Sequence, residues 1–233
     1  MRRALVSPHL DDAVLSCFAA LGPLSTVITI FTGGPGGDDL HSTWDAGCGA
    51  RSSRELMDRR RSEDLAACTA AGARAVHLPF RQQHYGEDAS TAELAAALAP
   101  ELAGADEVWL PAGVGGHPDH VRARAAAFAA LPAHAAVWIY AEYPYHQHVT
   151  RWTGAPSPVA ALAAWFAGQL GSAAVPTAIA ADPETKRAAV RCYASQLGSL
   201  QTTVDGTLLD DGPLGAEYAW LARRSEPPPH GPG

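Results

Sequence analysis

The stretch RALVSPHLDD (residues 3–12) sets the expected architecture of the amino-terminal half of the chain. Its first five residues form a short apolar run that predicts a β-strand, and the two aspartates stand where a helix would begin. An aspartate at such a position is most often a helix cap. A histidine three residues before the second carboxylate is also typical of a binding site, so both interpretations are open for His9, Asp11 and Asp12.

Strand-like and helix-like segments alternate over the first 142 residues. Short runs rich in β-branched or aromatic residues lie at 3–7, 26–31, 75–80, 107–112 and 136–142. Helix-like segments lie between them at 12–20, 53–72, 91–103 and 119–131. The alternation predicts an α/β fold in a single domain, with a Rossmann-like, mainly parallel sheet and helices on both faces.

The domain is expected to span residues 1–225, followed by a disordered, proline-rich tail at 226–233. Beyond residue 143 the alternation weakens, although Asp182 and Pro183 favour the start of a further helix. The glycine-rich stretch at 32–49 is too long for an ordinary connection, which predicts a functional or mobile loop.

Composition excludes several classes of partner and location. The 233-residue chain has a net charge of −7 and no basic stretch interleaved with aromatic residues, so nucleic acid is not an expected partner. Four cysteines without a C-x-x-C pair indicate reduced thiols. Without a signal-peptide pattern or a long apolar run, we expect a soluble, cytoplasmic protein with no membrane span. The sequence carries no signal for the oligomeric state.

Two polar clusters follow predicted strands whose carboxyl ends would meet at one edge of the sheet. The first is His9 with Asp11 and Asp12, and the second is HPDH at residues 117–120. Two histidines and a carboxylate with an open fourth position are the usual ligands of a catalytic zinc. Helix capping explains one carboxylate per helix, but not paired aspartates together with three histidines, so the pattern favours a metal site.

Other chemistries lack their motifs. The glycines of TGGPGG (32–37) have neither dinucleotide-binding nor P-loop spacing, and they favour a tight turn beside the site instead. There is no G-x-S-x-G elbow, and the cysteines lack a recognisable nucleophile pattern. His146 and His148 in YPYHQH (143–148) are further candidate ligands, although a pocket wall or exposed loop is the favoured interpretation.

The two clusters in combination resemble the PIG-L/LmbE-like family of zinc-dependent N-deacetylases and amidases. The resemblance covers roughly residues 3 to 200. Its specific part is PHLDD (8–12) with HPDH (117–120), and its weaker parts are RRRSEDLAACTAAGA (59–73), IYAEYPY (139–145) and KRAAVRCYASQ (186–196).

The resemblance implies a role for each matching residue. It makes His9, Asp12 and His120 the ligands of Zn²⁺, although such ligands also accept iron(II), cobalt or nickel. It makes Asp11 the general base. His117, oriented and held cationic by Asp119, would stabilise the oxyanion and assist the leaving amine. The substrate-contacting arginine of the family falls on Arg61, with Arg60 as the other candidate within the run of three.

Departures from the family pattern leave the substrate open. The common His-Pro-Asp-Asp-Glu motif is HLDDA here, with Leu10 and Ala13 as the replacements. The leading expectation is removal of an acyl group, most simply acetyl, from the nitrogen of a small amino-sugar-like metabolite. An amidase of a thiol-sugar conjugate is the alternative within the family. A receiver-like Mg²⁺-binding module is a third interpretation, but it leaves HPDH unexplained and needs an aspartate after the third strand, where the chain has LPFRQQ (78–83).

Overall fold

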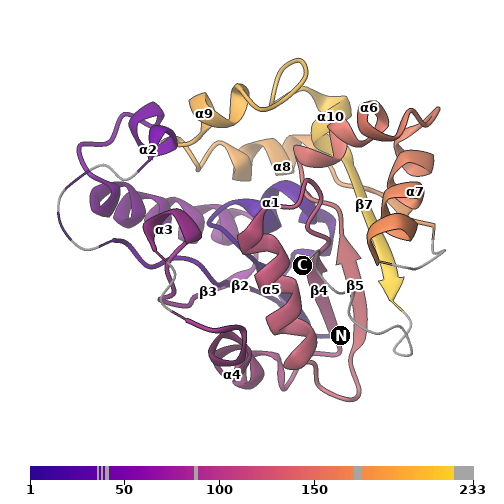
Figure 1. The fold of residues 1–233 in the computed structure, drawn as a ribbon, viewed down its shortest axis with the longest axis horizontal. Coiled ribbons are helices and arrows are strands. Elements are labelled where there is room, and N and C mark those ends of the chain that lie inside the picture. The colour runs from indigo at the N-terminus through magenta and orange to yellow at the C-terminus, as the bar shows by residue number, and fades with distance from the viewer. Residues whose placement is uncertain (36, 38, 40–41, 87–88, 171–174, 223–233) are drawn as a thin grey trace.

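The computed structural model describes residues 1–222 except 36, 38, 40–41, 87–88 and 171–174. Its strands form one seven-stranded sheet in the order β3-β2-β1-β4-β5-β7-β6 (Figure 1). Their bounds are β1 (Arg3–Ser7), β2 (Ser25–Thr29), β3 (Arg74–His77), β4 (Glu107–Pro111), β5 (Ala136–Tyr140), β6 (Thr177–Ala180) and β7 (Ala216–Ala222). Strands β1 to β5 are parallel, and β7 runs antiparallel to both β5 and β6. The predicted single-domain α/β fold with a mainly parallel sheet is confirmed.

Helices cover both faces of this sheet (Figure 1). The longer ones are α3 (Ser53–Ala70), α4 (Thr91–Leu102), α5 (Pro118–Ala129), α7 (Pro158–Leu170) and α8 (Pro183–Val190). The shorter ones are α1 (Asp12–Ser16), α2 (Thr43–Gly47), α6 (Val149–Thr153), α9 (Leu197–Gln201), α10 (Asp211–Gly215) and the 3₁₀ turns η1 (Phe18–Ala20), η2 (Gln83–Tyr85) and η3 (Tyr145–His148). Side chains alternate across β1, so Leu5 packs in the cluster with α1, α3 and α8, whereas Val6 packs in the cluster with α4 and α5.

Local signals in the sequence set most helix starts. Ser52 caps α3 by accepting the Glu55 N–H, and Ser90 forms a reciprocal capping box with Glu93 at the start of α4. Asp182 caps α8 as predicted, by accepting the Thr185 N–H at 3.1 Å. These caps satisfy N–H groups that have no partner within the helix.

The predicted helix at 12–20 is interrupted. It ends at Ser16 and continues as the 3₁₀ turn η1, because the N–H groups of Phe18 and Ala19 donate to the Glu217 carboxylate at 2.7 and 3.0 Å. Glu217 belongs to β7, which the sequence did not predict. A long-range contact therefore replaces the expected continuation of the helix.

The carboxyl-terminal third completes the sheet with β6 and β7, where the sequence indicated only helices and loops. Strand β7 pairs with β5, with Ile139 opposite Trp220, and the Trp220 ring stacks on Phe166 of α7. The predicted tail at 226–233 lies outside the described residues. Among the residues that are described, no helix combines the length and the apolar character needed to cross a bilayer.

The glycine-rich stretch after β2 is built around a close backbone approach. Gly33 N–H donates to the Phe80 carbonyl at 2.8 Å, and a Cβ at Gly33 would lie 2.4 Å from the Pro79 carbonyl oxygen. Only glycine fits there. The described part of the stretch also contains the short helix α2, so this segment is more ordered than a simple loop.

The buried ion pair between Lys186 of α8 and Glu217 should dominate the attachment of the carboxyl-terminal third. Their Nζ and Oε1 atoms lie 2.7 Å apart, and both side chains are buried. Lys186→Met should lower the free energy of unfolding by about 3–5 kcal/mol, because it leaves a buried carboxylate without its cation. Urea unfolding followed by circular dichroism measures this. Arg51→Met, which breaks the solvent-exposed pair with Glu55, is the control and should leave the midpoint unchanged.

Candidate active site

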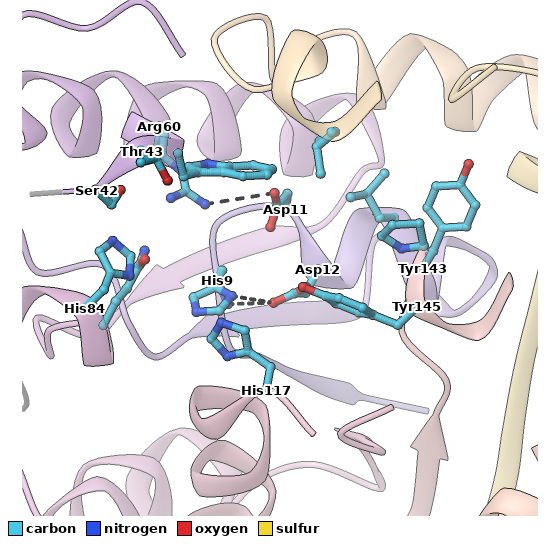
Figure 2. A pocket seen from close by; sticks show the side chains of 15 residues that line it. His9, Asp11, Asp12, Ser42, Thr43, Arg60, His84, His117, Tyr143 and Tyr145 are labelled. Atoms are coloured by element: carbon cyan, nitrogen blue, oxygen red, sulfur yellow. Dashed lines mark hydrogen bonds and ion pairs between the residues drawn. The ribbon is translucent and has the colours of Figure 1, made fainter. Parts of the chain in front are cut away.

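The two polar clusters meet where the order of strands reverses. Strand β1 lies between β2 and β4. From β1 the chain adds β2 and β3 on one side, and from β4 it adds β5 on the other side. Ligand sites of open α/β sheets form at such switch points, beyond the carboxyl ends of the strands. The segment after β1 and the turn into α5 therefore bring His9 and Asp12 beside His117 (Figure 2), more than a hundred residues later in the chain. His120 lies beside His9 as well.

Three donor atoms form a nearly equilateral triangle. Asp12 Oδ2 lies 3.4 Å from His9 Nδ1 and 3.4 Å from His120 Nε2, and the two nitrogens are 3.3 Å apart. A tetrahedral ion bonded at about 2.0–2.1 Å requires its ligand atoms to be about 3.3–3.4 Å apart. These three atoms therefore fit one face of a tetrahedral metal site.

In each of the two histidines of the triangle, the second ring nitrogen contacts a buried carboxylate. His9 Nε2 lies 3.0 Å from Asp119 Oδ2, and His120 Nδ1 lies 3.0 Å from Glu142 Oε1. Such pairs fix the orientation of a metal-binding imidazole and increase its basicity. Glu142, just beyond β5, also accepts the N–H groups of Gly113 and Val114 at 2.6 and 3.0 Å. Sequence reasoning missed Glu142, although a charged residue at the end of a predicted strand within the apolar stretch IYAEYPY was an available signal.

Electrostatics at the triangle favour positive charge. Although burial opposes the charged form, hydrogen bonds to Asp119 and Asp12 raise the pKa of His9 to about 9. Burial acts against ionisation of Asp12 as well, but His120 and His9 hold the pKa of this carboxyl well below its ordinary value. The carboxylates therefore create a local preference for a cation.

His117 lies beside the triangle in an orientation that differs from the prediction. A second grouping, in which His117 replaces Asp12, also brings three donor atoms within 4.8 Å of one another. The triangle with Asp12 has sides of 3.3–3.4 Å, the spacing that a tetrahedral ion requires. The Asp119 carboxylate bonds to His9 rather than orienting His117. Only the backbone N–H of Asp119 reaches His117, donating to Nδ1 at 3.2 Å.

The expected cationic form of His117 is also not favoured. Burial, followed by repulsion from His9 and His120, lowers the pKa of His117 to about 4. Because Nδ1 accepts a backbone N–H, the proton of the neutral ring is on Nε2. His117 is therefore a neutral hydrogen-bond donor with a fixed tautomer, not a resting cation.

Asp11 is buried beside the triangle and serves no capping function. It precedes α1, yet its side chain makes no cap hydrogen bond. Burial and the neighbouring Asp12 raise the pKa of Asp11 to about 6, against the opposing effect of Arg60 and His9. The backbone next to it is held by Gln196, whose Nε2 donates to the Leu10 carbonyl at 3.1 Å.

The pocket receives Arg60 rather than Arg61. Arg60 Nη2 lies 3.9 Å from Asp11 Oδ2, and its Nε has no hydrogen-bond partner among the described residues. Arg61 turns away, donating to the Thr32 carbonyl and the Asp58 carboxylate. Neighbouring residues of a helix point in directions about 100° apart, so only one of two adjacent arginines can face the pocket. The sequence favoured Arg61 for the substrate contact, but Arg60 is the arginine that lines the pocket, so Arg60 becomes the candidate.

These groups line a cavity of about 300 Å³ (Figure 2). Tyr143 and Tyr145 lie on one side of it, Ser42, Thr43 and His84 lie on the other, and His9, Asp11, Asp12 and His117 lie between them. His146 and His148 do not line it. The ring of His146 packs near Tyr143 and Tyr218, and His148 pairs with Asp205.

A family model described as PIG-L, GlcNAc-PI de-N-acetylase, matches residues 4–131, more than half of the chain. The chain belongs to the PIG-L family. The match includes both clusters of the triangle, and it removes the receiver-like interpretation.

Relatives of this PIG-L protein carry deacetylase names. The 2'-N-acetylparomamine deacetylase of Streptomyces fradiae is 32% identical over 169 residues, which span 62% of this chain and 57% of the relative. The chain thus covers little more than half the length of that curated relative. A teicoplanin-pathway deacetylase, solved as a complex with bog, superimposes with a TM-score of 0.71 at 26% identity, covering 97% of this chain and 100% of the other. The A40926 pseudoaglycone deacetylase gives 0.68 at 27% identity, covering 94% and 96%.

The two departures from the common PIG-L motif are structural in this protein. Leu10, in place of proline, is fully buried against Met57 and Tyr85. Ala13, in place of glutamate, is buried in the core of the α1 face, and its N–H donates to Ser7 Oγ at 3.1 Å. Neither replacement removes a donor from the triangle.

Metal titration of the PIG-L protein should distinguish the two histidine groupings. We expect one divalent ion per chain. His120→Ala and Asp12→Ala should abolish binding, because each removes a donor atom of the triangle formed by His9, Asp12 and His120, whereas His117→Ala should retain binding. Calorimetry on metal-free protein measures this. Loss of binding in His117→Ala with retention in Asp12→Ala would instead support the three-histidine grouping.

Glu142→Gln should weaken metal binding by about 10- to 100-fold, because the carboxylate that orients His120 becomes a neutral amide. Gly113 and Val114 donate to different oxygens of Glu142, so the single amide oxygen keeps one of these two hydrogen bonds, and circular dichroism checks that the variant is folded. Competition with a chromogenic chelator gives the affinity. An unchanged affinity in a folded variant would contradict the positioning of His120 by Glu142.

Proposed function

We propose that this protein is a metal-dependent N-deacetylase that hydrolyses the acetamido group of a small amino-sugar-like molecule. The observation that carries the proposal is the donor triangle of His9, Asp12 and His120, with Asp11 and His117 beside it in one pocket. The deacetylase names of the relatives support the reaction type. The partner is a small molecule rather than nucleic acid, and the cytoplasm remains the predicted location.

Zinc is the proposed metal, held by His9 Nδ1, Asp12 Oδ2 and His120 Nε2. Two imidazoles and one carboxylate suit zinc, and also iron(II), cobalt or nickel. When bound at such a site, the metal polarises the amide carbonyl and increases the acidity of water. The buried Asp119 and Glu142 carboxylates would hold the imidazoles in the ligating orientation.

Asp11 is the proposed general base. Its carboxylate is buried, follows next to Asp12 in the chain and lines the same pocket, where it would accept a proton from the attacking water. A base with a pKa somewhat below neutral is mostly ionised at pH 7 and accepts a proton effectively. Arg60 on the other side balances its negative charge.

His117 is the proposed partner of the oxyanion. The backbone hydrogen bond to Nδ1 leaves Nε2–H as a donor, and His117 lines the pocket. A neutral donor stabilises the negative oxygen that develops in the transition state. The amine takes the proton that Asp11 has accepted from water, so His117 keeps its Nε2 proton. Arg60, which lines the pocket, is the proposed contact for a polar group of the substrate.

Asp11→Asn should lower turnover by about 10²- to 10⁴-fold while leaving metal affinity within a few-fold of the wild type, because it removes a proton acceptor and not a ligand. Acetate release from N-acetylglucosamine, with one equivalent of zinc, cobalt or iron(II), measures turnover. Near-wild-type acetate release by the metal-loaded variant would show that Asp11 is not the base.

A further inference from the structure

A buried carboxylate outside the proposed chemistry fastens α2 to the pocket. Asp45 of α2 is fully buried and accepts hydrogen bonds from the Ser53 hydroxyl of α3 and from the Tyr85 hydroxyl of η2, the latter at 3.0 and 3.1 Å. A carboxylate is buried only where such partners offset its lost hydration. The three side chains come from three separate elements, so they hold those elements in one arrangement.

The turn η2 is also tied to the base of the pocket. The Gln83 N–H donates to both Asp119 oxygens at 3.1 and 3.3 Å, and Asp119 is the carboxylate behind His9. Tyr85, two residues later, packs with Leu10. His84 therefore lies between two anchored residues, which fixes it relative to the donor triangle.

The anchored elements present a wall of neutral polar groups. Ser42, Thr43 and Trp44 from the start of α2, together with His84, line the cavity. Figure 2 shows Ser42, Thr43 and His84 on the side away from Tyr143 and Tyr145. Partial burial lowers the pKa of His84 below its ordinary value, so its ring is neutral at pH 7 and can both donate and accept hydrogen bonds.

We propose that this wall, defined as Ser42, Thr43, Trp44 and His84, is the subsite for the ring hydroxyls of a sugar, with Asp45 as its positioning residue. The inference rests on the proposed deacetylation and adds how the substrate is oriented. Hydroxyl and neutral imidazole groups match sugar hydroxyls, which donate and accept hydrogen bonds and carry no charge. The Trp44 indole offers an apolar surface to the C–H face of a ring.

Orientation follows from the position of the wall. With the acetamido group over the triangle and the ring hydroxyls on this wall, further substituents of the sugar point toward Tyr143, Tyr145 and Leu200. That opposite wall is largely apolar and aromatic. The pocket is thus two-sided, and ring recognition is separate from the residues proposed to hold the metal.

The test compares two acetamides on the zinc-loaded, full-length protein: N-acetylglucosamine and N-acetylethanolamine, which lacks a ring. His84→Ala should raise KM for the sugar by about 3- to 10-fold, the equivalent of one hydrogen bond, without changing kcat or the hydrolysis of N-acetylethanolamine. Tyr85→Phe, which loosens the hold on Asp45 while keeping the aromatic ring, should show the same selectivity. His134→Ala, at an exposed histidine that does not line the cavity, is the matched control and should match the wild type on both substrates.

Equal losses on both acetamides, or an unchanged KM for the sugar in His84→Ala, would overturn the subsite. Calorimetric binding of glucosamine keeps this test separate from the proposed function. If no acetate is released from either compound, the deacetylase proposal fails, while weaker glucosamine binding by His84→Ala than by wild type would still support the wall. Wild-type protein that neither binds glucosamine nor hydrolyses N-acetylglucosamine would refute it.

Discussion

The pairing of buried carboxylates with imidazoles at the β1–β4 switch point is the constraint around which this protein is organised. Asp12, Asp119 and Glu142 are buried within a few ångströms of His9 and His120. Burying several carboxylates together is unfavourable unless positive charge is drawn between them. The donor atoms of His9, Asp12 and His120 have the spacing of one face of a tetrahedral site, so the arrangement that satisfies the electrostatics also suits the proposed metal.

The rest of the fold stabilises that arrangement from several directions. Parallel pairing of β1 with β4 places the two clusters at one edge, and Glu142 follows β5, the next strand outward. Glu142 contacts the proposed ligand His120 and also accepts N–H groups from the turn that precedes His117. One side chain therefore positions both His120 and the loop that leads to it. From the carboxyl-terminal third, Gln196 holds the Leu10 carbonyl between His9 and Asp11. A segment distant in sequence thereby fixes the local path of the first cluster.

Local patterns predicted much of this and failed where long-range contacts decide. The strand-to-helix spacing was enough to bring His9 and Asp12 together with HPDH (117–120), because strand ends in a parallel sheet converge whatever the details of packing. The family resemblance then selected His120 from the two histidines of HPDH. The choice between Arg60 and Arg61 depended on helix rotation within a run of identical residues. Three further features depend on contacts between distant segments: the pairing of Glu142 with His120, the pairing of Asp119 with His9, and the end of α1 at Ser16. Such contacts leave no periodic or motif signal in the sequence. Strands β6 and β7 are defined by pairing at the sheet edge, and β6 is only four residues long.

Asp119 links the proposed chemistry to the proposed recognition of substrate. Its Oδ2 lies 3.0 Å from His9 Nε2, and both of its oxygens accept the Gln83 N–H. The same carboxylate therefore orients the proposed ligand His9 and positions the turn that carries His84. Leu10, which stands where the common motif has proline, reinforces this link. The Leu10 side chain packs on Tyr85, and the Tyr85 hydroxyl donates to Asp45. The departure at residue 10 therefore lies on the side of the molecule that shapes the pocket wall and leaves the donors alone. A change of substrate within such a fold is best accommodated there, because Thr43 and His84 of the proposed wall are not partners of the buried carboxylates, whereas Ser42 caps the helix that carries Asp45.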